Sequence, residues 1–380
     1  MSLFEPCRIG SREARNRLIR SATSERLADE SGRPGDELRA LYSLLGRGGA
    51  GIIITGHAFV RPDGKSNAFM TGAHQDDSIP ALSALAREAH RHDALIFLQV
   101  NHAGAFAARD LVDMLICVSE VPMASILRPR KSEPPPALHE PDTREVYDLV
   151  DSFCAAARRA EEAGYDGVQI HCAHGYLAGQ FLSPRTNART DEFGGNPENR
   201  LRFLRAIVER VVAAKGSDFI VGVKWNCADF VEGGLDSKES LEALATLVKA
   251  GVGFVEISGG VGDAVETILR KGVTSQEQEA YFMDTAIAFR ERIVAPMALV
   301  GGIRSPQIAA QVVDRGFEFV SMSRPFIREP DIPLLFREGR RAACVSCNRC
   351  LFSKKRGVFC RCTEKGGPAK LSKEIVQGAS

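Results

Sequence analysis

The sequence predicts a closed eight-stranded parallel barrel, a (β/α)8 or TIM barrel, followed by a short cysteine-rich C-terminal extension. Short apolar, β-branched runs alternate along the chain with segments of helical periodicity, as expected for parallel strands that are buried on both faces. The runs are residues 17–22, 51–56, 95–100, 167–173, 219–227, 254–260, 297–303 and 317–324. Strands that alternate with helices in this number favour a closed barrel over an open doubly wound sheet.

Helices are predicted between the strands. Asp142 to Glu145 resembles a capping box that opens a helix running to about residue 163. Asn196 is followed by proline, which suits the first turn of another helix. Further helices are predicted at residues 79–91, 237–249 and 306–315.

Residues 46–51, GRGGAG, match the glycine spacing GxGxxG of dinucleotide-binding turns. The dinucleotide turn follows a strand and opens a helix, whereas this segment follows a helical pattern and precedes a strand. We therefore interpret it as a helix C-cap and turn.

The charge balance excludes several classes of partner. The chain has 49 basic and 48 acidic residues, so nothing favours nucleic acid or an anionic membrane surface. No apolar run approaches the roughly 20 residues of a membrane helix, and the first residues do not resemble a secretory signal. We expect a cytoplasmic protein, a homo-oligomer, that acts on a small molecule.

Half of the cysteines are clustered. Of the 10 cysteines, five crowd together near the C-terminus: Cys344, Cys347, Cys350, Cys360 and Cys362. In a reducing compartment such a cluster indicates a metal or iron–sulfur site. We therefore divide the chain into a barrel, residues 1–339, and a cysteine-rich tail, residues 340–380. Within the barrel, the proline-rich residues 128–140 are predicted to form a long loop at its mouth.

The ends of the last two strands indicate a phosphate site. Phosphate groups often bind to the loops after strands seven and eight of such barrels. Gly301 and Gly302 would let backbone N–H groups approach an anion, and Ser323 and Arg324 add a hydroxyl and a fixed cation. The alternative is a plain barrel turn with a surface arginine.

The predicted fourth strand ends in His171, His174 and Tyr176. Two imidazoles and a phenol offer hydrogen-bond donors that converge on one small volume, where they could stabilise negative charge on a substrate oxygen. Tyr176 could also act as a general acid. The alternatives are a zinc site, for which no third ligand stands nearby, or structural histidines.

Lys224 stands in an apolar strand, where a buried lysine needs a partner. A cation here could lie beside an anionic cofactor ring. Without a cofactor, the expected partner is Asp229 or Glu232.

Residues 171–200 closely resemble the signature of the old yellow enzyme family, and Asn16-Arg17, Gln99 with His102, and residues 322–325 also fit. The resemblance covers about residues 3–335. It implies an FMN-containing barrel that takes electrons from NADH, NADPH or a redox partner. It further implies that FMN delivers hydride to an activated C=C bond of an enone or enoyl-CoA-type substrate, or runs this reaction in reverse.

The resemblance also assigns residues by position. Gln99 should bind the flavin pyrimidine, and Lys224, where the family usually has arginine, should lie beside flavin N1. His171 and His174 match the pair that binds the substrate oxygen, and Tyr176 matches the proton donor. The remaining FMN contacts are expected from Ala22, Thr23, Gly56, Gly301, Gly302, Ser323 and Arg324.

The tail resembles that of a narrower branch, which includes 2,4-dienoyl-CoA reductase and trimethylamine dehydrogenase. This resemblance implies a [4Fe–4S] cluster on Cys344, Cys347, Cys350 and either Cys360 or Cys362, with zinc as the competing metal. Branch members usually continue into FAD and NAD(P) domains, so we expect that module to be absent or on a separate electron-transfer protein. The second hypothesis is that the chain is an electron-transfer flavin/iron–sulfur subunit of a larger complex.

Overall fold

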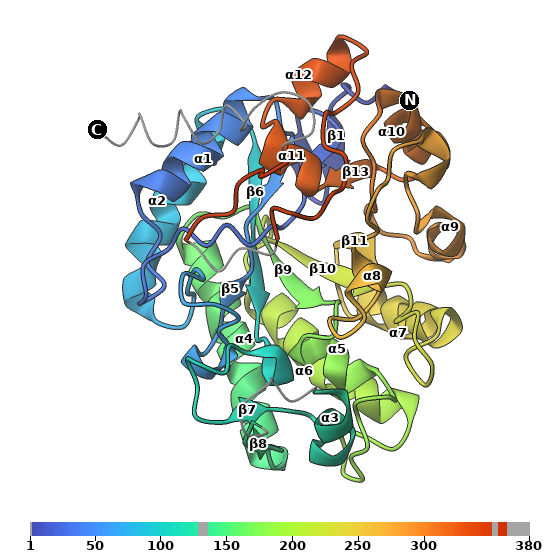
Figure 1. Ribbon diagram of the computed structural model, residues 1–380. Helices are drawn as coiled ribbons and strands as arrows, with labels where there is room; N and C mark the ends of the chain where they lie inside the picture. Colours follow the sequence, from blue (N-terminus) through green and yellow to red (C-terminus); the bar gives the residue numbers. More distant parts are fainter. Residues whose placement is uncertain (1, 128–135, 352–355, 363–380) are drawn as a thin grey trace.

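The computed structural model describes residues 2–127, 136–351 and 356–362. Its centre is a closed sheet of parallel strands with helices around it (Figure 1). The barrel strands are β3 (Leu18–Arg20), β4 (Ile52–Ile54), β6 (Leu95–Asn101), β9 (Gly167–Cys172), β10 (Ile220–Asn226), β11 (Phe254–Ser258), β12 (Met297–Val300) and β13 (Phe319–Met322). Each pairs in parallel with the next, and β13 pairs with β3, which closes the ring. The predicted fold class and all of its predicted strands are confirmed.

Helices pack against the outside of the barrel because each presents an apolar stripe to the strands. They are α1 (Asp36–Arg47), α2 (Ile79–His90), α4 (Thr143–Glu162), α6 (Pro197–Ala214), α7 (Ser237–Lys249), α9 (Met283–Arg292) and α10 (Pro306–Asp314). Figure 1 shows α1, α2 and α4 on one side of the barrel and α7, α9 and α10 on the other. Short helices α11 (Arg324–Arg328) and α12 (Ile332–Arg337) follow the last strand.

The predicted helix ends are confirmed by their caps. The Asp142 carboxylate accepts a bond from the Glu145 backbone N–H, and the Glu145 carboxylate accepts one from the Asp142 N–H, both at 2.8 Å. Asn196 caps α6 with a single bond, which its side chain accepts from the N–H of Asn199. Gly48 is the C-cap of α1, so the GxGxxG-like segment is the predicted cap and turn.

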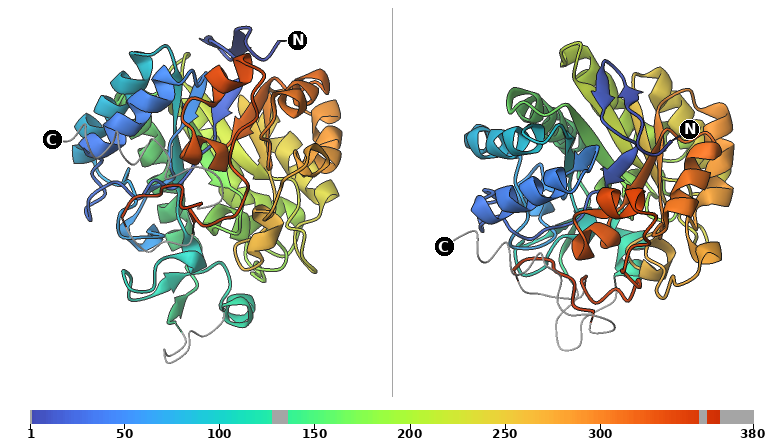
Figure 2. Two further views of the ribbon diagram at one scale, coloured as in Figure 1. Left: turned by 45° about the horizontal axis from the view of Figure 1, so that its top comes forward. Right: turned by 90° about the horizontal axis from the view of Figure 1, so that it is seen from above.

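The amino end of the barrel is closed by a hairpin that was not predicted. Strands β1 (Cys7–Ile9) and β2 (Arg12–Ala14) pair antiparallel, and their apolar side chains join a cluster of residues from the barrel interior. Figure 2 shows this hairpin at one end of the barrel and the C-terminal segment at the opposite end. The hairpin therefore leaves only the carboxyl end of the barrel open.

Between β6 and α4 the chain leaves the barrel. The predicted long loop, residues 128–140, is wrong for its last part, because β8 (Leu138–His139) pairs in parallel with β7 (Leu115–Ile116). A two-residue strand is too short to show a period in the sequence. Residues 128–135 lie outside the described residues. The other short elements are β5 (Ala58–Phe59), α3 (Glu120–Ile126), α5 (Leu177–Leu182), α8 (Val265–Ile268) and the 3-10 turns Pro62–Gly64, Asp76–Ser78, Gly104–Phe106 and Gln276–Gln278.

None of the helices in the described part of the chain has the length and hydropathy that a membrane crossing requires.

Candidate active site

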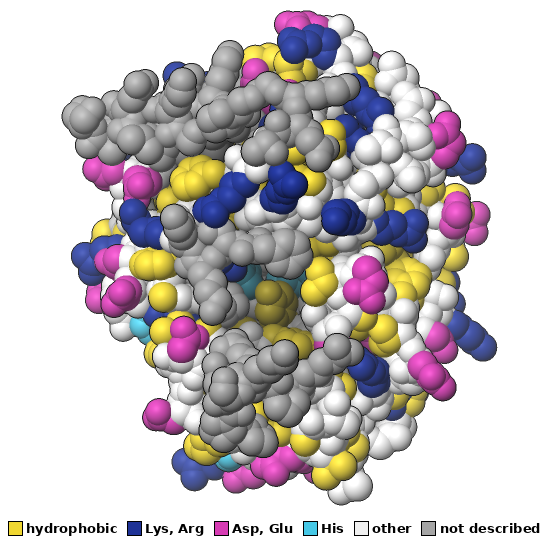
Figure 3. Space-filling view, in the orientation of Figure 1, with side chains coloured by type: hydrophobic (Ala, Val, Ile, Leu, Met, Phe, Trp, Pro, Cys, Tyr) yellow, Lys and Arg dark blue, Asp and Glu magenta, His cyan; other side chains and the backbone are white. Residues whose placement is uncertain are grey.

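The carboxyl ends of the strands surround one cavity with a volume of about 190 Å³. Figure 3 shows histidine side chains at the bottom of a hollow near the centre of this face. The predicted cofactor and catalytic residues that line the cavity are Ala22, Thr23, Gln99, His171, His174, Tyr176, Lys224, Gly301, Gly302, Ser323 and Arg324. Parallel strands bring these side chains together because all their carboxyl ends meet at the same edge.

Gly56 is the predicted cofactor residue that does not line the cavity. Its backbone N–H donates to Glu25 Oε1 at 2.9 Å, and a Cβ at this position would lie 1.9 Å from Glu25 Oε2. Glu25 is itself buried in an ion pair of 2.7 Å with Arg20. The glycine is therefore required by the packing of this carboxylate, and its predicted contact with the flavin ring stays a prediction.

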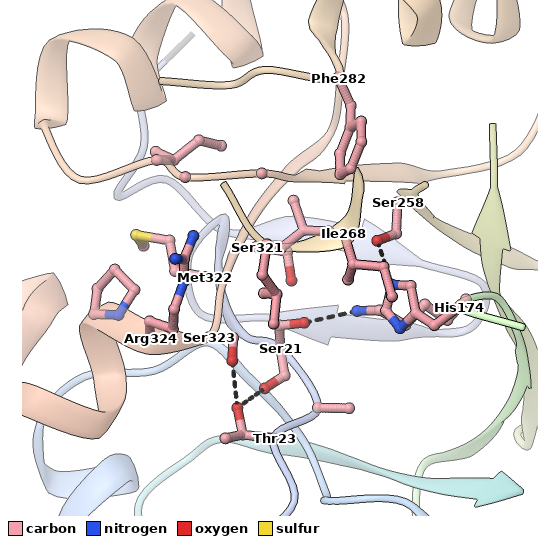
Figure 4. A pocket seen from close by; sticks show the side chains of 18 of the residues that line it. Ser21, Thr23, His174, Ser258, Ile268, Phe282, Ser321, Met322, Ser323 and Arg324 are labelled. Carbon is pink, nitrogen blue, oxygen red and sulfur yellow. Dashed lines mark hydrogen bonds between the residues drawn. The ribbon is translucent and has the colours of Figure 1, made fainter. Parts of the chain in front are cut away.

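The predicted phosphate residues form one end of the cavity (Figure 4). Gly301 and Gly302 have φ angles of +143° and +72°, a region that favours glycine. The hydroxyls of Ser323 and Thr23 lie 2.8 Å apart. The Arg324 guanidinium donates to the carbonyl oxygen of Arg270 at 2.9 Å and to Asn348 Oδ1 at 2.5 Å.

This end also contains residues that the sequence analysis missed. Arg304 lines the cavity and adds a second buried guanidinium, and Ser346 and Leu351 reach it from the C-terminal segment. Arg304 stands two residues after Gly302, so its place shortly after strand β12 was a usable signal. Ser346 and Leu351 gave no such signal, because their position depends on how the tail returns to the barrel.

Lys224, which also lines the cavity, is paired with a residue that was not predicted. Its Nζ lies 3.0 Å from Glu256 Oε2 and donates to Ser21 Oγ at 2.9 Å. Register explains the choice, because Lys224 on β10 lies opposite Glu256 on β11. The expected partner Asp229 instead accepts hydrogen bonds from Asn226 and Ser183.

His171, His174 and Tyr176 converge on one wall of the cavity. The ring of His171 lies 5.0 Å from the ring of His174 and 5.0 Å from that of Tyr176, measured between centroids. The N–H of Ala173 donates to His171 Nδ1 at 3.3 Å, which assigns the proton of the neutral ring to Nε2. His174 Nε2 lies 2.8 Å from the hydroxyl oxygen of Ser258 (Figure 4).

Burial sets the protonation states of this wall. Burial, followed by the nearby charges of Lys224 and the other imidazoles, holds the pKa of His171 and of His174 well below the usual 6.5. Burial raises the pKa of Tyr176 above its usual 10.0, against a smaller opposing effect of Arg26. At neutral pH the site therefore holds two neutral imidazoles and a protonated phenol.

His57 is a further imidazole of this site that the residue assignments missed. It lines the cavity at the carboxyl end of β4, and its ring centroid lies 5.3 Å from that of Tyr176. Burial, with a smaller contribution of Arg26, lowers its pKa to about 4. Its place directly after a strand was the signal that could have identified it.

The five clustered cysteines line a second, small cavity, together with Arg324 and Ser346 of the first. As they stand, however, no three His, Cys, Asp or Glu side chains within residues 2–127, 136–351 and 356–362 are close enough together to hold a metal ion. The described residues do not show the predicted metal or iron–sulfur centre, nor a zinc site at the histidine pair.

Comparison with known proteins identifies the family. The model of the NADH:flavin oxidoreductase / NADH oxidase family matches residues 2–342. An NADH oxidase of Thermoanaerobacter brockii is 33% identical over 355 residues, which are 91% of this chain and 53% of that protein. A 4,4'-dithiodibutanoate disulfide reductase of Rhodococcus erythropolis is 29% identical over 392 residues, 94% of each chain.

A solved structure agrees with these matches. The old yellow enzyme homologue of Zymomonas mobilis is 27% identical, with a TM-score of 0.74 over 89% of this chain and 93% of that one. This chain thus spans nearly all of some relatives and about half the length of others, such as the NADH oxidase. The chain belongs to the old yellow enzyme family, the NADH:flavin oxidoreductase / NADH oxidase family, and is an FMN-dependent oxidoreductase.

Proposed function

We propose that this enzyme reduces an activated C=C bond of a small molecule, an enone or an enoyl-CoA-like thioester, with electrons from NADH or NADPH. The observation that carries the proposal is the wall formed by His171, His174 and Tyr176. It offers neutral hydrogen-bond donors and a protonated phenol in a cavity whose other residues suit FMN.

The cavity has the chemistry that FMN requires. Its cations are Lys224, Arg304 and Arg324, and no aspartate or glutamate of the described residues lines it. Arg304, Arg324, Ser323 and the glycine pair would hold the phosphate, and Gln99 and Lys224 would face the ring. When bound, FMN supplies a hydride from its N5 atom.

The side chains of this wall have two roles, binding of the substrate oxygen and donation of a proton. The N–H groups of His171 and His174 hold the carbonyl oxygen of the substrate and stabilise the negative charge that develops there, a contribution of about 10²–10³-fold in rate per donor. Neutral imidazoles suit this role because they donate without giving up their proton to the oxygen. The Tyr176 hydroxyl protonates the α-carbon.

The test replaces Tyr176 by phenylalanine, which keeps the ring and removes only the acid. We expect NADH-dependent reduction of 2-cyclohexenone and crotonyl-CoA to fall by about 10²–10⁴-fold. Oxidation of NADH by an artificial acceptor, which needs no substrate proton, should stay within about twofold. Tyr147→Phe, on the outer helix α4, is the matched control. Equal enone reduction by Tyr176→Phe and the wild type would refute the assigned role.

A second candidate function is electron transfer through the cysteine-rich segment. The cavity of Cys344, Cys347, Cys350, Cys360 and Cys362 borders the flavin cavity through Arg324 and Ser346. Thiols in this number suit a [4Fe–4S] cluster or zinc, and the cluster would serve a protein electron donor.

Metal analysis after anaerobic purification separates these alternatives. Iron with acid-labile sulfide supports the cluster, and zinc alone supports a structural metal. Cys347→Ser should lose the metal, whereas Cys154→Ser, on helix α4 outside the segment, should keep it. A wild-type protein without metal would eliminate this candidate and leave the C=C reductase.

A further inference from the structure

We propose that Glu256 is a positioning residue that sets the redox potential of the bound flavin, by neutralising Lys224 and by fixing the polarity of the Gln99 amide. No flavin-binding role was predicted for this carboxylate. The inference rests on the proposed placement of Lys224 and Gln99 against the flavin ring.

Glu256 is a buried carboxylate on strand β11. Its side chain is fully buried, and four donors meet its two oxygens. Oε1 accepts from Ser21 Oγ at 2.6 Å and from Ser321 Oγ at 2.5 Å, and Oε2 accepts from Gln169 Nε2 at 3.0 Å and lies 3.0 Å from Lys224 Nζ. Although burial opposes ionisation, Lys224 and these donors bring the pKa of Glu256 below its usual 4.5. A carboxylate with this many donors stays ionised at neutral pH.

The carboxylate fixes the orientation of two side-chain amides, first that of Gln169 and through it that of Gln99. An ionised carboxylate can only accept, so Gln169 must point its NH₂ group at Glu256. Gln169 Oε1 then accepts from Gln99 Nε2, at 2.6 Å. The carbonyl oxygen of Gln99 is thereby left for the cavity that Gln99 lines. An acceptor there matches N3–H, the donor on the flavin pyrimidine.

The same carboxylate cancels the charge of the lysine. A lone buried cation beside the ring would stabilise the extra negative charge of the reduced form. With Glu256 at 3.0 Å, the pair presents a dipole in place of a full positive charge. The carboxylate therefore holds the flavin potential below the value that Lys224 alone would give. A low potential makes the reduced flavin a stronger hydride donor.

The test is Glu256→Gln, which keeps the shape and removes the charge. Loss of the carboxylate should favour reduced over oxidised FMN by at least about tenfold, a positive shift of about 30 mV for a two-electron couple. The potential is measured by anaerobic equilibration with reference dyes, and the affinity for oxidised FMN by fluorescence titration. Asp166→Asn is the matched control, a buried carboxylate at the amino end of β9. It should leave the potential unchanged.

A second variant, Lys224→Gln, distinguishes a failure of this inference from a failure of the proposed flavin placement. If the potential of Lys224→Gln equals that of the wild type, the placement fails. If Lys224→Gln shifts the potential downward but Glu256→Gln leaves it unchanged, the placement stands and the inference is overturned.

A double variant, Lys224→Gln with Glu256→Gln, covers the case in which the single glutamate variant does not fold, because it leaves no buried charge unpaired. Its potential should lie near that of the wild type and above that of Lys224→Gln. A double variant as low as Lys224→Gln would show that Glu256 has no influence on the flavin.

Discussion

Acidification should destabilise this protein in a pH range set by its buried imidazoles. The loss in the free energy of unfolding can be worked out for His57. Its pKa is about 4 in the folded chain, against a usual value of 6.5. Between these values the unfolded chain binds a proton that the folded chain does not, so the free energy of unfolding falls as the pH falls from about 6.5 to about 4. Because the pKa of His57 falls from 6.5 to about 4 on folding, this loss in the free energy of unfolding is about 3 kcal/mol.

The variant that isolates this loss is His57→Gln. Glutamine cannot titrate, and it can still accept a hydrogen bond from Asn101 Nδ2, which now lies 2.9 Å from His57 Nδ1. As the pH falls below 6.5, the free energy of unfolding of the variant should therefore fall by up to about 3 kcal/mol less than that of the wild type. His171 and His174 remain in both proteins and contribute in the same direction, so they cancel in the comparison.

Urea unfolding at a series of pH values measures the effect. The single tryptophan, Trp225, is a convenient probe, because it is buried in β10 with its indole N–H bonded to Ser240 Oγ at 2.8 Å. If His57→Gln shows the same pH slope as the wild type, the argument from burial is wrong.

Four further substitutions test other parts of the structure. Gly56→Ala drives a Cβ into Glu25 and should destabilise the chain by about 1–3 kcal/mol, measured as a lower urea midpoint. Asp142→Ala removes the capping box of α4 and should cost about 1 kcal/mol in the same assay. Arg324→Ala should weaken FMN binding by about 10- to 150-fold in a fluorescence titration, the equivalent of about 1.5–3 kcal/mol for a charged hydrogen bond, and Asn348→Ala should weaken it less. Unchanged affinity in Arg324→Ala would remove this residue from the phosphate site.

Strand positions could be predicted because each barrel strand is a short, mostly apolar run. Parallel strands are buried on both faces, and this requirement is visible in a single sequence. The hairpin β1–β2 was missed because its three-residue strands are too short for a period, and their side chains are buried only by the barrel above them. Short strands depend on tertiary contacts, which single-sequence patterns do not contain.

The site residues likewise include some that the sequence could place and some that depend on tertiary structure. Residues that directly follow a barrel strand could be placed at the mouth without knowledge of the register. Glu256 could not be assigned as the partner of Lys224, since that pairing depends on which residues of β10 and β11 lie opposite each other. A one-residue slip would turn either side chain away from the other.

The cysteine-rich segment is less separate from the barrel than the predicted boundary after residue 339 implies. Asn348, between Cys347 and Cys350, bonds to Arg324, a residue that lines both cavities. The backbone N–H of Gly357 also donates to the carbonyl oxygen of Arg26, at 2.8 Å, so the segment contacts both early and late parts of the barrel. Arg324 therefore joins the cysteine-rich segment directly to the phosphate end of the cavity, across the predicted boundary.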